Sequence, residues 1–345
     1  MSNRYRRRSL RASQAVPAES TPDKIRVPTL GEVLFFSTPQ IARLRIEFLN
    51  LLCASGLPDT RDLNIHACLK KLDEWAQHVK QETERNLHRF QDNASEYRNS
   101  EAFWRAGMMV TVLQQDLGVR YNPDCINTEK FNSSGEGFIH GILRGEGGTC
   151  ANLPILYAAV GRKLGYPIYV CCAKRHLFNR WATRDGKECF NIEGSGKGFS
   201  SLPDDYYMKA RYTVNPREVR LGFYLRNLDP AEELAIFMAT RGHCLRDRGL
   251  LLDAIVAYAH AHRLGPFQPP IFYSMMEAIR GEMHIHAEGK APNSYREWEG
   301  WDKIPRPDKR ILTDEFDRVL KSPPVFRPKE AIVIKGFREG ENHGI

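Results

Sequence analysis

The chain has 345 residues, 42% of them hydrophobic, and a formal net charge of +8. This length and composition can bury a sizeable core, which excludes a wholly disordered chain and predicts about two domains. No apolar run approaches the ~20 residues that cross a bilayer, so we expect no membrane span. The eight cysteines form no C-x-x-C pair, and we identify no signal peptide. We therefore expect reduced thiols in a cytoplasmic protein, rather than disulfides or structural zinc.

The basic charge is concentrated at the N-terminus. Residues 1–28 contain seven Lys or Arg residues and two acidic residues, which leaves +5 there and +3 for the rest of the chain. This Ser- and Pro-containing segment cannot build a core and is predicted to be a disordered basic tail. Such a tail could contact an anionic partner, or it could be an inert solubilising arm.

Between residues 29 and 118 the pattern is helical. Apolar residues recur at helical spacing over residues 39–52, 62–89 and 100–117. Asp62 and Ser100 are the predicted N-caps of the second and third helices, and Gly118 is a predicted stop. The following segment, up to residue 148, is rich in Asn, Ser and Gly and is predicted to be a loop with one short helix near residues 138–143.

A glycine-rich turn over residues 145–149 leads into a further predicted helix over residues 151–164. In this helix Leu156, Val160 and Leu164 place an apolar residue at every fourth position, and Gly165 provides a C-terminal stop. Cys150 therefore lies at the N-terminus of the predicted helix. There the helix dipole and the free backbone N–H groups favour a thiolate over a thiol, as a nucleophile requires.

The next segment is predicted to form a small antiparallel sheet. Residues 168–172 are an apolar run with β-branched members, which predicts a buried strand. Asp185-Gly186 separates residues 176–181 from residues 189–193, and this dipeptide between two such runs is typical of a tight hairpin.

The register of this hairpin decides which side chains meet. A two-residue turn at Asp185-Gly186 would place Arg180 opposite Asn191, and His176 and Glu193 would then share one face as diagonal neighbours. A carboxylate can reach an imidazole from there. A bulge or a longer turn could shift the register and separate the two side chains.

Cys150, His176 and Glu193 together suit a nucleophile, a general base and an orienting carboxylate. Such a set attacks an amide carbonyl with no metal or organic cofactor, and the backbone N–H of the cysteine can help to bind the oxyanion. His140, ten residues before Cys150, is an alternative base.

Three sequence blocks resemble the transglutaminase-like superfamily, most closely bacterial proteins of the SirB1 type. They are Gly-Gly-Thr-Cys-Ala-Asn at residues 147–152, His-Leu-Phe-Asn-Arg-Trp at residues 176–181 and Phe-Asn-Ile-Glu-Gly-Ser-Gly-Lys-Gly at residues 190–198. The resemblance spans roughly residues 100–225. It implies a papain-like α+β fold, with the cysteine helix packed on an antiparallel sheet that carries the histidine and an acid. Glu193 stands where most members have Asp, and many SirB1-type proteins lack the cysteine.

Beyond residue 228 the pattern changes to a helical hairpin. Counted from Ala235, five residues fall at relative positions that a tetratricopeptide repeat of about 34 residues uses for packing, namely Gly242, Ala254, Tyr258, Ala261 and Pro266. This segment resembles one such repeat, which SirB1-type proteins often carry after the transglutaminase-like domain, and a further helix is predicted over residues 271–283. Such a unit packs on its neighbouring domain or presents a groove to a partner peptide.

The predicted organisation is a basic tail (1–28), a transglutaminase-like domain (29–227), a tetratricopeptide-like region (228–287) and a Pro- and charge-rich extension (288–345). The central domain divides into a helical lobe up to residue 118 and a catalytic core. The expected function is a cysteine-dependent acyl transfer on amide bonds of protein or peptide substrates, either as a peptidase or deamidase or as a transglutaminase. The alternative is a catalytically silent scaffold for protein interactions that uses the repeat.

Overall fold

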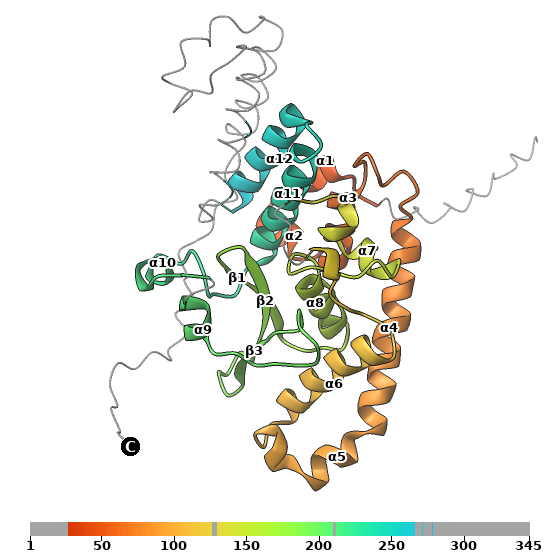
Figure 1. The fold of residues 1–345 in the computed structure, drawn as a ribbon, viewed down its shortest axis with the longest axis vertical. Coiled ribbons are helices and arrows are strands. Elements are labelled where there is room, and N and C mark those ends of the chain that lie inside the picture. The colour runs from red at the N-terminus through yellow and green to blue at the C-terminus, as the bar shows by residue number, and fades with distance from the viewer. Residues whose placement is uncertain (1–26, 126–129, 210–211, 266–270, 272–277, 279–345) are drawn as a thin grey trace, which may run out of the picture.

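The computed structural model describes residues 27–125, 130–209 and 212–265, together with residues 271 and 278. This part of the chain has a mixed α+β architecture in which a small sheet lies against one central helix, α8 (Leu153–Lys163) (Figure 1). The residues of α8 from Leu153 to Gly161 are all buried. Helices α3, α4, α6 and α7 surround the rest of α8. An α+β fold consistent with a transglutaminase-like core is therefore confirmed.

The first helices bury their apolar faces around this centre. They are α1 (Leu30–Val33), α2 (Thr38–Ile41), α3 (Ile46–Ala54), α4 (Ile65–Arg85), α5 (Leu87–Asp92) and α6 (Glu101–Gln115). The single helix predicted over residues 39–52 is wrong, because the chain turns after α2 and Arg45 is extended, with φ −74° and ψ 141°. This bend lets both Ile41 and Ile46 enter the core.

The predicted caps of the next two helices have different outcomes. Asp62 is not the N-cap of α4, because Asn64 holds that position and its side chain accepts a hydrogen bond from the Ala67 N–H at 2.9 Å. Asp62 instead accepts a hydrogen bond from Arg144. Ser100 is confirmed as the cap of α6, where its hydroxyl accepts from the Phe103 N–H at 3.0 Å. Gly118 follows the helix with φ +69°, as a stop requires.

The chain before α8 also contains short 3-10 turns. Turn η1 (Ala94–Tyr97) lies between α5 and α6, and the described residues between α6 and α8 hold η2 (Pro123–Cys125), η3 (Ser134–Glu136) and the predicted short helix α7 (Ile139–Leu143). Helix α8 begins at Leu153 and not at residue 151, with Asn152 as its N-cap. Before it, the Thr149 carbonyl accepts hydrogen bonds from the N–H groups of Asn152 and Leu153. Cys150 therefore lies in a turn that leads into the helix.

The sheet has three antiparallel strands in the order β1 (Ile168–Ala173), β2 (His176–Ala182) and β3 (Cys189–Ile192). Arg180 pairs with Asn191, so the predicted register is confirmed. The turn itself is longer than predicted. The Thr183 N–H donates to the Glu188 carbonyl at 2.9 Å, and residues 184–187 form the loop. The pairing is unchanged because the longer loop takes one extra residue from each strand.

Both faces of the sheet are covered. Helix α8 packs on β1 and β2, and on the other face the Tyr207 ring of α9 (Asp204–Met208) stacks on Phe178 of β2. The chain after α10 (Pro216–Arg220) returns to the edge of β1. The N–H groups of Leu225 and Leu228 donate to the carbonyls of Cys172 and Val170, both at 2.9 Å. Cys171 and Cys172 are both buried.

The helical hairpin predicted after residue 228 is present as α11 (Pro230–Arg246) and α12 (Leu251–Leu264). Gly242 allows the two helices to approach, since a Cβ at that position would lie 2.5 Å from the ring of Tyr258. Helix α11 also packs on α2 and α3 (Figure 1). One buried hydrophobic cluster runs from α1 to α12, so residues on both sides of residue 228 share a core, and the predicted domain boundary there stays a prediction.

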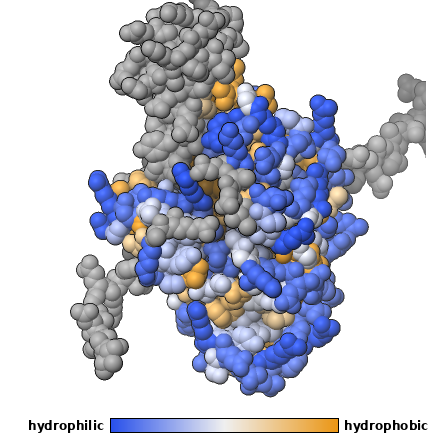
Figure 2. Space-filling view, in the orientation of Figure 1, coloured by the Kyte–Doolittle hydropathy of each residue, from blue (hydrophilic) through white to orange (hydrophobic). Residues whose placement is uncertain are grey.

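The surface of the described residues is mainly hydrophilic in the view of Figure 2, with small hydrophobic areas among the charged residues. Exposed large hydrophobic side chains include Phe35, Tyr206, Leu221 and Leu250. None of the described helices is long and apolar enough to cross a bilayer. The predicted basic tail up to residue 26, most of the predicted helix over residues 271–283, Pro266 and the extension from residue 288 lie outside the described residues.

Candidate active site

The turn that carries Cys150 is held by its two polar neighbours. Asn152 is fully buried, and its amide nitrogen donates to the carbonyls of Gly135 at 2.8 Å and Phe138 at 3.0 Å. Its amide oxygen accepts from the Thr149 N–H at 2.7 Å. The Thr149 hydroxyl donates to a carbonyl of η3 and accepts from the Ala151 N–H. Cys150 is thus only partly buried but has an ordered backbone on both sides.

The glycines before this turn are required by close backbone contacts. The Gly148 N–H donates to the Arg120 carbonyl at 2.9 Å, and the Gly148 carbonyl accepts from the Asn122 N–H at 2.8 Å. A Cβ on Gly148 would lie 2.6 Å from the Leu153 side chain, and Gly147 has φ +88°. The Gly-Gly pair therefore clamps the approach to Cys150 against the segment that follows α6.

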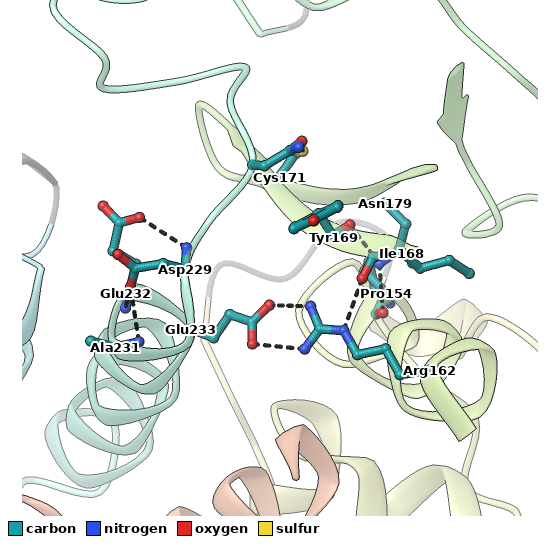
Figure 3. Close-up of polar contacts among 11 residues, drawn as sticks. Pro154, Arg162, Ile168, Tyr169, Cys171, Asn179, Asp229, Ala231, Glu232 and Glu233 are labelled. Atoms are coloured by element: carbon teal, nitrogen blue, oxygen red, sulfur yellow. Dashed lines mark hydrogen bonds and ion pairs between the residues drawn. The ribbon is translucent and has the colours of Figure 1, made fainter. Parts of the chain in front are cut away.

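A side chain of β2 fixes the start of α8 to the sheet. The Asn179 amide donates to the Pro154 carbonyl at 2.9 Å, one of the contacts drawn in Figure 3. Asn179 is fully buried and lies on the α8 side of the sheet. This contact sets the distance between the Cys150 turn and the first residues of β2. The Cys150 Sγ atom consequently lies 3.9 Å from the Arg175 carbonyl, next to His176.

His176 and Glu193 are brought together on one face of the sheet, as the register predicts. The His176 Nε2 atom lies 2.7 Å from the Glu193 Oε2 atom, and both side chains are largely buried. Glu193 accepts two further hydrogen bonds, from the Ser195 N–H on Oε1 at 3.3 Å and from the Tyr207 hydroxyl on Oε2 at 3.2 Å. Three donors therefore surround one carboxylate.

The two ionisable groups shift each other's pKa in opposite directions. Burial alone would lower the pKa of His176, but hydrogen bonds with Cys150 and Glu193, together with the Glu193 charge, raise this pKa to about 9. Burial would raise the pKa of Glu193, yet the hydrogen bond and charge of His176 bring it below its ordinary value. At neutral pH the pair is thus an imidazolium and a carboxylate.

The tautomer follows from these contacts. Because Nε2 is directed at Glu193, Nδ1 is the ring nitrogen that remains for the thiol of Cys150. The geometry can therefore place a proton between the sulfur and the imidazole, while the carboxylate fixes the ring. Among the residues that the structure describes, no group of three or more His, Cys, Asp or Glu side chains is arranged to hold a metal ion.

Comparison with protein families places this geometry in a known context. Residues 66–234 match the family described as the transglutaminase-like superfamily. The chain contains a transglutaminase-like domain. Comparison with curated proteins gives no match, and comparison with solved structures gives none either. The matched range is wider than the resemblance seen in the sequence, since it starts within α4 and ends within α11.

The alternative base lies elsewhere in the transglutaminase-like domain. His140 is buried in α7, and its Nε2 atom lies 3.2 Å from the Ser134 hydroxyl of η3. Burial lowers the pKa of His140 to about 4, which leaves the ring neutral at neutral pH. The nearest polar partner of the His140 ring is therefore Ser134 and not Cys150. The contacts favour His176 as the partner of Cys150.

Two residues of the domain that support the site carry no signal in the sequence. Gln114 of α6 donates to the carbonyls of Gly194 at 3.2 Å and Gly196 at 3.1 Å, and it accepts from the Gly198 N–H at 2.7 Å. It thereby holds the loop that follows Glu193. The Tyr207 hydroxyl of α9 donates to Glu193 itself. Both come from segments that only the tertiary fold brings to the hairpin.

Proposed function

We propose that the transglutaminase-like domain is a cysteine-dependent acyl-transfer enzyme that acts on amide bonds of protein or peptide substrates. The Cys150 sulfur attacks the amide carbonyl, and His176 passes its proton to the departing amine as the C–N bond breaks. Glu193 keeps the imidazole oriented, and the Cys150 N–H contributes to the oxyanion site. Water then releases the acyl group as an acid, or a primary amine releases it as a new amide.

One observation carries this proposal. The 2.7 Å contact between His176 and Glu193 lies at the start of β2, next to Arg175, whose carbonyl is 3.9 Å from the Cys150 sulfur, and it leaves Nδ1 for the thiol. A buried ionised pair carries a high desolvation cost, which the three hydrogen-bond donors around Glu193 offset. Ionisable groups with shifted pKa values of this kind are concentrated at functional sites. The half-buried thiol is accessible to a substrate, whereas Cys53, Cys171 and Cys172 are buried.

The direct test is covalent capture of the acyl group. We expect an activated acyl donor or a fluorogenic peptide amide to acylate the wild-type chain at one site, and Cys150→Ala to abolish the adduct in intact-protein mass spectrometry. Cys189→Ala is the matched control, because Cys189 is an exposed thiol on β3. If the adduct is lost in Cys189→Ala and retained in Cys150→Ala, the nucleophile is Cys189 and the proposed role of Cys150 is wrong.

The acceptor is identified with the same acyl enzyme. Added primary amine should divert the product from acid to amide if the domain is a transglutaminase, whereas a peptidase or deamidase continues to release acid. A wild-type chain that forms no adduct with a broad panel of donors would contradict the proposal. If Cys150→Ala then still retained a bound peptide partner, that outcome would favour the interaction scaffold based on the α11–α12 pair.

A further inference from the structure

Tyr207 is the polar side chain that approaches Glu193 from outside the hairpin. Its hydroxyl donates to the Glu193 Oε2 atom at 3.2 Å, the same oxygen that lies 2.7 Å from His176 Nε2. The ring is fully buried. The Cys150, His176 and Glu193 set therefore has a fourth member that touches the carboxylate and not the thiol.

The phenol is a permanent donor. Burial and the negative charge of Glu193 raise the pKa of Tyr207 above its ordinary value, so the hydroxyl is protonated at neutral and acidic pH. A hydrogen bond to an ionised carboxylate stabilises the charged form relative to the neutral acid. The carboxylate of Glu193 is thus stabilised in its ionised form by a neutral group that cannot itself become charged at working pH.

The ring of Tyr207 restrains the same region by packing. It stacks on Phe178 with 4.2 Å between centroids and 11° between planes, and its centroid lies 6.1 Å from that of His176. The ring of Tyr212 lies 4.9 Å from His176 on the same side. These aromatic contacts restrict rotation of the imidazole about its own axis.

The position of Tyr207 is set by a network that contains no member of the proposed triad. Asp204, at the start of α9, accepts hydrogen bonds from Arg180 at 2.5 Å and from Asn191 at 2.8 Å. Arg180 and Asn191 are a cross-strand pair and also bond to each other at 2.8 Å. Helix α9 is thereby bound to β2, which begins at His176, and to β3, which ends directly before Glu193.

We propose that Tyr207 is a positioning residue of this site, which holds the Glu193 carboxylate ionised and aimed at His176. The inference rests on the proposed function, since the carboxylate has an orienting role only if the imidazole takes part in acyl transfer. Removal of the hydroxyl alone, in Tyr207→Phe, preserves the ring and its stacking but takes one donor away from Glu193.

The expected consequence is a change in how the rate of Cys150 alkylation depends on pH. The acid limb is the part of this profile in which the rate falls as the pH is lowered. Alkylation by iodoacetamide requires the thiolate, which the imidazolium and carboxylate support as long as Glu193 is ionised. Without the phenol, Glu193 takes up a proton at higher pH. We expect the acid limb in Tyr207→Phe to move up by about one pH unit, the size expected for the loss of one hydrogen bond to a charged group.

The measurement is the rate of Cys150 alkylation across the acid range, followed by mass spectrometry. Tyr157→Phe is the matched control, because Tyr157 is also a buried tyrosine and its hydroxyl donates to the carbonyl of Gly194, next to Glu193. Its acid limb should superimpose on that of the wild type. A Tyr207→Phe profile that also superimposes, whatever its melting temperature, would overturn the role of Tyr207 and leave the proposed function intact.

A second measurement needs no variant and covers the case in which Tyr207→Phe folds poorly. In wild-type chain with ¹³C-labelled tyrosine, the Cζ signal of Tyr207 should shift with the same midpoint as the acid limb, because protonation of Glu193 changes the hydrogen bond. A signal that does not move through that range would overturn the inference. If wild-type alkylation has no acid limb distinct from that of Glu193→Gln, the proposed function fails as well.

Discussion

At the scale of single residues, the contact between His176 and Glu193 follows from the sequence, and the surroundings of the contact do not. The Asp-Gly turn and the alternation of strand residues suffice to place the two side chains on one face. Side chains alternate between the two faces of a strand, so only a register shift by an odd number of residues would separate them. The second and third hydrogen bonds to the Glu193 carboxylate come from Ser195 and Tyr207. No local pattern in the sequence indicates that the Tyr207 hydroxyl ends beside that carboxylate.

The raised pKa of His176 gives a pH dependence of stability with a definite sign. A group whose pKa is about 9 in the folded chain and 6.5 as a free side chain binds its proton more tightly in the folded state. Its contribution is complete below pH 6.5 and is lost as the pH rises through about 9. Glu193, with a lowered pKa, loses its contribution as the pH falls.

We therefore expect the stability advantage of the wild type over His176→Ala to shrink by about 3 kcal/mol as the pH rises across that alkaline range. Urea unfolding at several pH values measures it. His140→Ala is the control with the opposite sign, because the lowered pKa of His140 makes its contribution fall as the pH drops from 6.5 towards about 4. A His176→Ala difference that stays constant with pH would show that folding does not raise the pKa of His176.

At the scale of elements, the sequence predicts which segments are helices and strands better than where they begin. Strands β1, β2 and β3 and helices α6, α7, α8, α11 and α12 are confirmed, because apolar periodicity and stop glycines mark them. The start of α4 is wrong because two side chains, Asp62 and Asn64, could both serve as the cap. The start of α8 is late because the turn of Cys150 is stabilised by the side chain of Asn152.

The loop after β3 depends on one close contact that the sequence does not reveal. A Cβ on Gly194 would lie 2.3 Å from the ring of Tyr157, which is buried in α8 and cannot move aside. We expect Gly194→Ala to lower stability by about 1 to 3 kcal/mol through this overpacking. Because the same loop follows Glu193 directly, we also expect slower alkylation of Cys150.

Gly196→Ala is the control in the same loop, since nothing lies within 4 Å of a Cβ at that position. It should leave both the melting temperature and the alkylation rate close to those of the wild type. Equal losses in the two variants would mean that loop flexibility, rather than the Tyr157 contact, determines the effect.

At the scale of the whole molecule, the helix pair after residue 228 is joined to the sheet-bearing core by a buried ion pair. Arg162, near the C-terminal end of α8, donates both terminal nitrogens to the Glu233 carboxylate, at 3.0 Å and 2.5 Å (Figure 3). It also donates to the Ile168 carbonyl at the start of β1. Glu233 is only 1% exposed. A helix, a strand and the following helix pair thus share one guanidinium.

This arrangement predicts an asymmetry between removing one charge and removing both. Arg162→Met leaves the Glu233 carboxylate buried without its cation, which should cost about 3 to 5 kcal/mol of unfolding free energy. The double variant Arg162→Met with Glu233→Met removes the uncompensated charge and should recover part of that loss.

Lys70→Met is the control, because the Lys70–Glu74 pair is exposed and such pairs contribute about 0 to 1 kcal/mol. Denaturant unfolding of the wild type and the three variants measures these differences in unfolding free energy. If the double variant is no more stable than Arg162→Met, the loss comes from the Ile168 contact and packing, and the buried charge does not link the helix pair to the core.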